Sequence, residues 1–95
     1  LKTPRSSGTA AAAPAVSPEL DMRGMMTDEA IPVMERYIDS AQRAKLETVT
    51  IIHGKGTGVL RAAGQKSLRT NRQVKSFRLG RYGEGEDGVT VVTLK

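Results

Sequence analysis

The feature that most constrains the fold is the segment Thr48–Gly58, in which a run of β-branched residues stops in a cluster of glycines. The run Thr48–His53 (TVTIIH) is nearly continuously apolar, which is typical of a strand buried in the centre of a sheet. Three of the next five residues are glycine, and residues 59–69 then show apolar residues at helical spacing. The segment therefore predicts a central strand, a tight glycine loop and a helix.

Four further elements follow from local patterns in the rest of the chain. Glu19–Arg23 and Val74–Leu79 alternate as half-buried strands do, and Val89–Leu94 (VTVVTL) is a β-branched run. A helix is predicted from Thr27 to about Leu46, with the Thr27 hydroxyl as its N-terminal cap and two acidic residues in its first turn.

The first predicted helix has an apolar stripe, and each of the two helices contains one unfavourable residue. The stripe is formed by Ile31, Met34, Ile38 and Ala41, widened by Ala30, Val33, Tyr37 and Ala44. Pro32 predicts a bend or a start delayed toward Ile31, because its ring crowds the preceding turn. In the second helix, Val59, Leu60, Ala63 and Leu68 form the predicted apolar side. Gly64 costs on the order of 1 kcal/mol relative to Ala, which is tolerable if it packs closely on the sheet.

The order of these elements is βαβαββ and predicts an α/β, two-layer sandwich. Helical crossovers make the first three strands parallel, and the last strand can pair antiparallel with the third. The expected result is a four-stranded mixed sheet with two helices on one face. Ligands gather at the carboxyl ends of parallel strands. The segments Asp21–Gly24 and His53–Gly58 should therefore meet there.

Composition divides the chain in two and limits its class. Residues 1–17 are rich in Ala and Pro and predict a disordered linker, with an Ala-rich helix as the alternative, so that residues 18–95 form the domain. The chain has no Cys, which excludes a disulfide scaffold and a thiolate metal site. No apolar run approaches the roughly 20 residues that span a bilayer. We expect a cytoplasmic protein without membrane contact, and a chain that begins with Leu is expected to be part of a longer one.

Charge is distributed unevenly along the predicted domain. No acidic residue occurs between Thr48 and Gly83, while this stretch holds eight bases. They are Lys55, Arg61, Lys66, Arg69, Arg72, Lys75, Arg78 and Arg81. Between Glu19 and Glu47, seven acids outnumber four bases. One basic half indicates a polyanionic partner such as DNA or RNA, and the alternative is an ordinary solvated surface.

The glycine loop is the strongest chemical signal. Backbone N–H groups of Gly54, Gly56, Thr57 and Gly58, together with the helix N-terminus, can form a concavity for an anion. Lys55 and Arg61 add positive charge beside it. The spacing matches neither of the usual glycine motifs of nucleotide sites, so a phosphate of a polymer is preferred to a nucleotide. The alternative is a tight turn that only needs glycine.

Three side chains at this edge are candidates for chemistry. His53, the only histidine, can act as a general acid or base, and the alternative is a structural hydrogen-bond donor. Asp21 can orient the imidazole or bind a divalent metal such as Mg²⁺ or Mn²⁺, and Arg23 can bind phosphate. An Asp21–Arg23 ion pair that only shapes the site is the equal alternative.

LDMRG at Leu20–Gly24, HGKGTG at His53–Gly58 and GEGxxGVTVV at Gly83–Val92 together resemble the Smr (small MutS-related) domain. The Arg that ends LDxR resembles the version at the C-terminus of the second bacterial MutS paralogue. The resemblance implies a two-layer fold, DNA or RNA binding, and metal-stimulated endonuclease activity in several members. It also implies that the rest of a MutS-type chain accompanies the domain, and family roles in suppressing recombination or rescuing ribosomes.

By this resemblance, Asp21, Arg23, His53, Lys55 and the loop glycines map onto the family's functional edge. The chain departs from the family at Glu86-Asp87, where a Gly and a small residue are usual, and this added charge could recruit metal or repel phosphate. The function expected is sequence-tolerant binding of DNA or RNA with nicking of the phosphodiester backbone. The alternative is a binding module without chemistry, docked on nucleic acid or on a ribosome.

Overall fold

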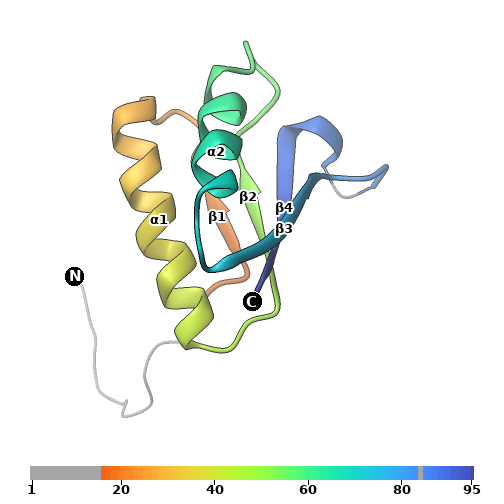
Figure 1. Ribbon diagram of the computed structural model, residues 1–95. Coiled ribbons are helices and arrows are strands. Elements are labelled where there is room, and N and C mark those ends of the chain that lie inside the picture. The colour runs from red at the N-terminus through yellow and green to blue at the C-terminus, as the bar shows by residue number, and fades with distance from the viewer. Residues whose placement is uncertain (1–15, 84) are drawn as a thin grey trace, which may run out of the picture.

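The computed structural model describes residues 16–83 and 85–95, and Figure 1 shows its helices and strands. The elements are β1 (Glu19–Asp21), α1 (Thr27–Arg43), β2 (Thr48–Ile52), α2 (Val59–Arg69), β3 (Val74–Leu79) and β4 (Val89–Leu94). The predicted order is confirmed, and so are the bounds of α2, β3 and β4. The strands β1 and β2 and the helix α1 end slightly earlier than predicted.

The sheet is mixed, with the strand order β1-β2-β4-β3. β1 pairs parallel with β2, and β4 pairs antiparallel with both β2 and β3. The first three strands therefore run in the same direction, as predicted, and the predicted pairing of β4 with β3 is confirmed. The insertion of β4 between β2 and β3 was not predicted. It places the two β-branched strands in the centre and the charged strands β1 and β3 at the edges.

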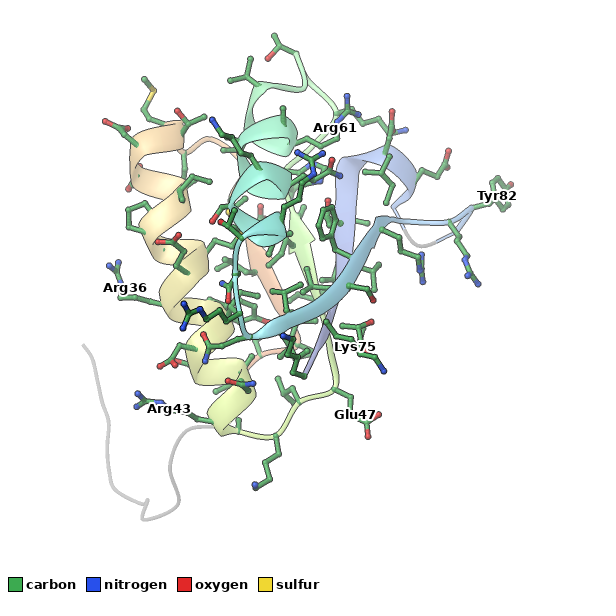
Figure 2. All side chains as sticks on the ribbon, viewed as in Figure 1. Arg36, Arg43, Glu47, Arg61, Lys75 and Tyr82 are labelled. Carbon is green, nitrogen blue, oxygen red and sulfur yellow. The ribbon has the colours of Figure 1, made fainter. Side chains whose placement is uncertain are left out.

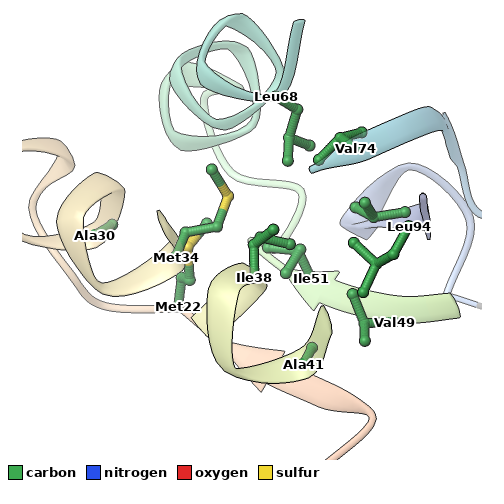
Figure 3. Packing of buried hydrophobic residues seen from close by; sticks show 11 residues of the cluster. Met22, Ala30, Met34, Ile38, Ala41, Val49, Ile51, Leu68, Val74 and Leu94 are labelled. Atoms are coloured by element: carbon green, nitrogen blue, oxygen red, sulfur yellow. The ribbon is translucent and has the colours of Figure 1, made fainter. Parts of the chain in front are cut away.

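One hydrophobic core lies between the sheet and the two helices, which cover the same face (Figures 1 and 3). Its fully buried members include Met34 and Ile38 of α1 and Val49 and Ile51 of β2. The remaining core residues are Met22, Ala30, Ala41, Leu68, Val74, Val92 and Leu94. The predicted two-layer α/β sandwich is therefore confirmed.

The start of α1 differs from the prediction in two ways. Thr27 is the first residue of the helix and Met26 precedes it as the cap, without a side-chain hydrogen bond. The predicted Thr27 cap is therefore wrong, because a residue with helical backbone cannot place its hydroxyl over the first turn. The delayed start is also wrong, since Pro32 lies inside a helix that already begins at Thr27. Pro32 sits near the helix N-terminus on the exposed side, where its ring leaves the core packing unaffected.

Local irregularity also changes which residues face the core. A register shift between Val74 and Ser76 interrupts the alternation predicted for β3, so that Val74 and Phe77 both contact the core. Val59, predicted on the apolar side of α2, is 61% exposed because it stands at the first position of the helix. These are effects of backbone placement that residue type alone does not indicate.

The N-terminal boundary of the domain includes two residues predicted as linker. Val16 packs against the core, and the Tyr37 hydroxyl donates a hydrogen bond to the Ser17 carbonyl oxygen. The remainder of the predicted linker, residues 1–15, lies outside the described residues.

Among the residues that the structure describes, neither helix has the length and apolar character needed to cross a membrane.

Candidate functional site

The carboxyl ends of β1 and β2 meet, as the topology predicted. The Met22 N–H donates to the Ile52 carbonyl oxygen at 2.7 Å, which extends the parallel pairing beyond β1. Gly54 has a φ of +80°, and a Cβ on it would lie 3.4 Å from Arg23 Cγ. The side chain of Arg23 therefore lies directly over Gly54, and a larger residue at this position would be strained by the positive φ.

The loop between β3 and β4 holds the start of the glycine loop in place. The N–H groups of His53 and Gly54 both donate to the Gly88 carbonyl oxygen, at 3.1 and 2.9 Å. The N–H of Gly54 is thus already paired within the protein. The Gly54 N–H is therefore not available to bind an anion, although the sequence analysis had included it in the anion site. The same hydrogen bonds attach the glycine loop to the end of the sheet.

The glycine loop borders a small hollow of about 170 Å³, which is lined by residues 53–58, Leu60 and Arg61. Gly58 precedes α2 with a φ of +83°, and a Cβ on it would lie 3.0 Å from a guanidinium nitrogen of Arg61. The guanidinium therefore folds back over Gly58. The first N–H groups of α2, which have no acceptor inside a helix, lie at the same end.

Lys55 and Arg61 converge on one carboxylate. Lys55 Nζ lies 3.7 Å from Asp87 Oδ1, and Arg61 Nη1 lies 3.9 Å from Asp87 Oδ2. Asp87 belongs to a short 3-10 turn, Glu86–Gly88, immediately before β4. In Figure 2, Arg61 reaches from α2 toward this loop. Two cations from different elements thus define one anion position.

His53 points into the domain rather than toward solvent, and its residue is 7% exposed. Nδ1 lies 3.0 Å from the Gly54 carbonyl oxygen and must donate to it, because a carbonyl oxygen only accepts. In the neutral ring, Nε2 then accepts from the Thr90 hydroxyl at 2.8 Å. The Thr90 oxygen also accepts from Gln65 Nε2 at 3.4 Å. This geometry favours the structural alternative for His53, since both ring nitrogens are engaged inside the protein.

Asp21 and Arg23 form the ion pair that the sequence left as an alternative. Arg23 Nη2 donates to Asp21 Oδ2 at 2.7 Å, and Arg23 Nε donates to Asp21 Oδ1 at 3.0 Å. The backbone N–H of Arg23 donates to the same Oδ1. These bonds, the side-chain ones foremost, lower the pKa of the Asp21 carboxyl from 3.8 to about 2. They also raise the pKa of the Arg23 guanidinium. A carboxylate with so low a pKa is a weak base at neutral pH.

The described residues contain no group of three or more His, Cys, Asp or Glu side chains that could hold a metal ion. At the edge formed by β1 and the glycine loop, Asp21 shares both carboxylate oxygens with Arg23. Asp21 therefore does not fit a divalent ion as it stands, because the ion would have to displace the guanidinium of Arg23 from both carboxylate oxygens.

Further exposed basic residues lie on α2, in the turn after it and on β3. Lys66 and Arg69 are exposed on α2, Arg72 follows it, and Lys75 is exposed on β3. In Figure 2, Arg36 extends from α1, away from the β3–β4 loop. The predicted basic stretch thus covers α2, the turn after it and β3, and Lys66 lines the groove between α1 and α2.

Two contacts at the candidate site escaped the sequence analysis. Thr90 had no assigned role, although a polar residue at a core-facing position of an otherwise apolar strand was a usable signal. Asp87 was recognised as a departure from the Smr pattern, but its ion pairs with Lys55 and Arg61 depend on how the β3–β4 loop folds.

Comparison with known proteins agrees with this architecture. Residues 20–95 match the profile of the Smr domain. The chain belongs to the Smr domain family. The match covers all of the elements from β1 to β4 except the first residue of β1.

Among sequence relatives, "Endonuclease MutS2" of Caldanaerobacter subterraneus subsp. tengcongensis is 61% identical over 82 residues, which is 86% of this chain and 10% of that protein. The chain thus spans about a tenth of the length of the curated relatives it matches. Among solved structures, the Smr domain of Thermus thermophilus MutS2 has a TM-score of 0.80 and 42% identity, covering 81% of this chain and 96% of that one. YdaL, a stand-alone small MutS-related protein from Escherichia coli, has a TM-score of 0.78 at 23% identity, covering 82% of this chain and 64% of that one, and shares the fold.

Proposed function

We propose that this Smr domain binds nucleic acid through the phosphates of its backbone, with the glycine-loop edge as the primary contact. The observation that carries the proposal is the convergence of Lys55 and Arg61 on a single carboxylate. A phosphate diester bears the same single negative charge as that carboxylate and presents two oxygens to the same donors. Arg23, whose side chain lies over Gly54, adds a third cation at the same edge.

The remaining basic residues support a polymeric rather than a small ligand. Arg69 and Arg72 add exposed positive charge at the end of α2 and beyond it, and Lys66 adds one in the groove between α1 and α2. A chain of phosphates can contact several of these side chains at once, and such contacts carry little sequence information. Binding is therefore expected to be sensitive to salt and tolerant of base sequence.

The binding test uses a fluorescent 20-base-pair DNA duplex and the RNA duplex of the same sequence, titrated at several salt concentrations. Lys55→Ala should weaken binding about 5- to 20-fold and lower the slope of log K against log salt by about 1. Arg36→Ala is the matched control, because it removes one exposed positive charge from α1. Equal effects of both variants, or binding that does not change with salt, would contradict the proposal.

Phosphodiester cleavage is the second candidate, favoured by the similarity to proteins called Endonuclease MutS2. In this proposal Arg23 and Lys55 neutralise the charge that develops on the phosphorus oxygens. Asp21 fixes the orientation of Arg23 through its two hydrogen bonds. His53 is a positioning residue, because its Nδ1–H holds the Gly54 carbonyl and thereby the glycine loop.

The cleavage test follows conversion of supercoiled plasmid to the relaxed circle, in EDTA and with Mg²⁺ or Mn²⁺ added. Asp21→Asn and Arg23→Ala should lower the rate. His53→Ala should lower the melting temperature and the binding affinity together with the rate. If His53→Ala instead lowers the rate about 10²–10⁴-fold while binding and stability are unchanged, His53 transfers protons and the positioning role is wrong. Plasmid left intact under all conditions would leave phosphate binding as the function.

A further inference from the structure

Asp87 is the unusual feature of the proposed phosphate site. Its carboxylate oxygens lie 3.7 Å from Lys55 Nζ and 3.9 Å from Arg61 Nη1, so it takes the position between the two cations. The turn that carries it is attached to the glycine loop through the Gly88 carbonyl oxygen, which accepts from His53 and Gly54. The carboxylate is therefore held at the site by the backbone of its own loop.

These ion pairs are exposed and long, which makes them replaceable. The side chains of Lys55 and Asp87 are 63% and 53% exposed, and that of Arg61 is 34% exposed. Exposed pairs of this kind contribute little to stability and are screened by salt. A ligand with several phosphates can displace the carboxylate from the cations, whereas a single small anion competes with a group that is tethered beside them.

We propose that Asp87 is an intramolecular competitor for the phosphate position between Lys55 and Arg61, and that it restricts this position to polymeric phosphates. The inference rests on the proposed binding function. It makes Asp87 a specificity-determining residue, because a lone phosphate gains only these two cations. A nucleic acid strand also contacts Arg23 and the basic side chains of α2.

Glu86 provides a matched control, because it is the neighbouring carboxylate in the same turn and is exposed. Asp87→Asn and Glu86→Gln remove the same charge with nearly the same shape, but only Asp87 is paired with Lys55 and Arg61. Asp87→Asn should tighten binding of the 20-base-pair duplex about 3- to 10-fold at low salt, and Glu86→Gln less than about 2-fold. The gain should shrink at about 1 M salt, where the screening length falls to about 3 Å.

Two further measurements separate competition from a general charge effect. In a chain that also carries Lys55→Ala and Arg61→Ala, Asp87→Asn should improve binding no more than Glu86→Gln does. Inorganic phosphate, followed by the amide NMR signals of the glycine loop, should bind Asp87→Asn more tightly than the unmodified chain. Asp87→Ser serves as a second variant, and its melting temperature verifies that the loop remains folded.

Binding by Asp87→Asn that equals or falls below that of the unmodified chain would overturn the inference, since Asp87 would then orient the cations instead of competing for them. Equal gains from Asp87→Asn and Glu86→Gln would overturn it as well. If Lys55→Ala weakens binding while Asp87→Asn does not strengthen it, only this inference fails. If Lys55→Ala has no effect, the proposed binding site itself fails.

Discussion

Replacing Gly64 with alanine should stabilise the domain, although this glycine is buried on the side of α2 that faces the core. A Cβ at this position would lie 3.8 Å from both Met22 Cε and Met34 Sδ, which is ordinary van der Waals contact. Alanine is more favourable than glycine in a helix by about 0.8–1.0 kcal/mol. The new methyl group would also be buried, and burial of one such group contributes up to about 0.8 kcal/mol.

The two effects together predict that Gly64→Ala raises the free energy of unfolding by about 1–1.5 kcal/mol. For a domain of this size, each kcal/mol raises the melting temperature by about 4–8 °C. Urea unfolding followed by far-UV circular dichroism measures the change directly. The same substitution at Gly80 should destabilise, because a Cβ there would lie 2.6 Å from Val89 Cγ2 and 2.8 Å from the Glu86 carbonyl oxygen. A Gly64→Ala variant less stable than the unmodified chain would refute the packing described between α2 and the two methionines.

Two other predictions concern the polar contacts of the site. Thr90→Val should lower the free energy of unfolding by about 1–2 kcal/mol, because His53 loses a buried hydrogen-bond partner. The control Thr93→Val, on the half-exposed side of β4, should change it little. Urea unfolding of both variants measures the difference. The Asp21 carboxyl should titrate at about 2 by NMR and return toward 3.8 in Arg23→Gln. Because the folded-state pKa is the lower one, this ion pair stabilises the fold above about pH 3.8, and its contribution is lost as the pH falls through about 2. An Asp21 pKa near 3.8 in the unmodified chain would contradict the ion pair.

The sequence by itself determined the elements and their order. β3, β4 and α2 begin and end where local residue preferences predicted, because glycine and polar turn residues separate segments of clear periodicity. The meeting of the β1 and β2 ends also followed from the sequence, since consecutive parallel strands joined by a helix place their carboxyl ends at one edge. The basic stretch after Thr48 also indicated a polyanionic partner, because charge can be counted directly from the sequence.

Tertiary structure decided the position of β4 and the roles of individual side chains. Strand order depends on which apolar strands bury one another, and local preferences do not contain this information. His53 turns inward because Gly54 and Thr90, distant from each other in sequence, provide a partner for each ring nitrogen. Asp87 reaches Lys55 only because the β3–β4 loop folds back onto the glycine loop. Contacts between distant segments form when the whole core assembles, so the chemistry of each residue at the site could be assigned only from the folded domain.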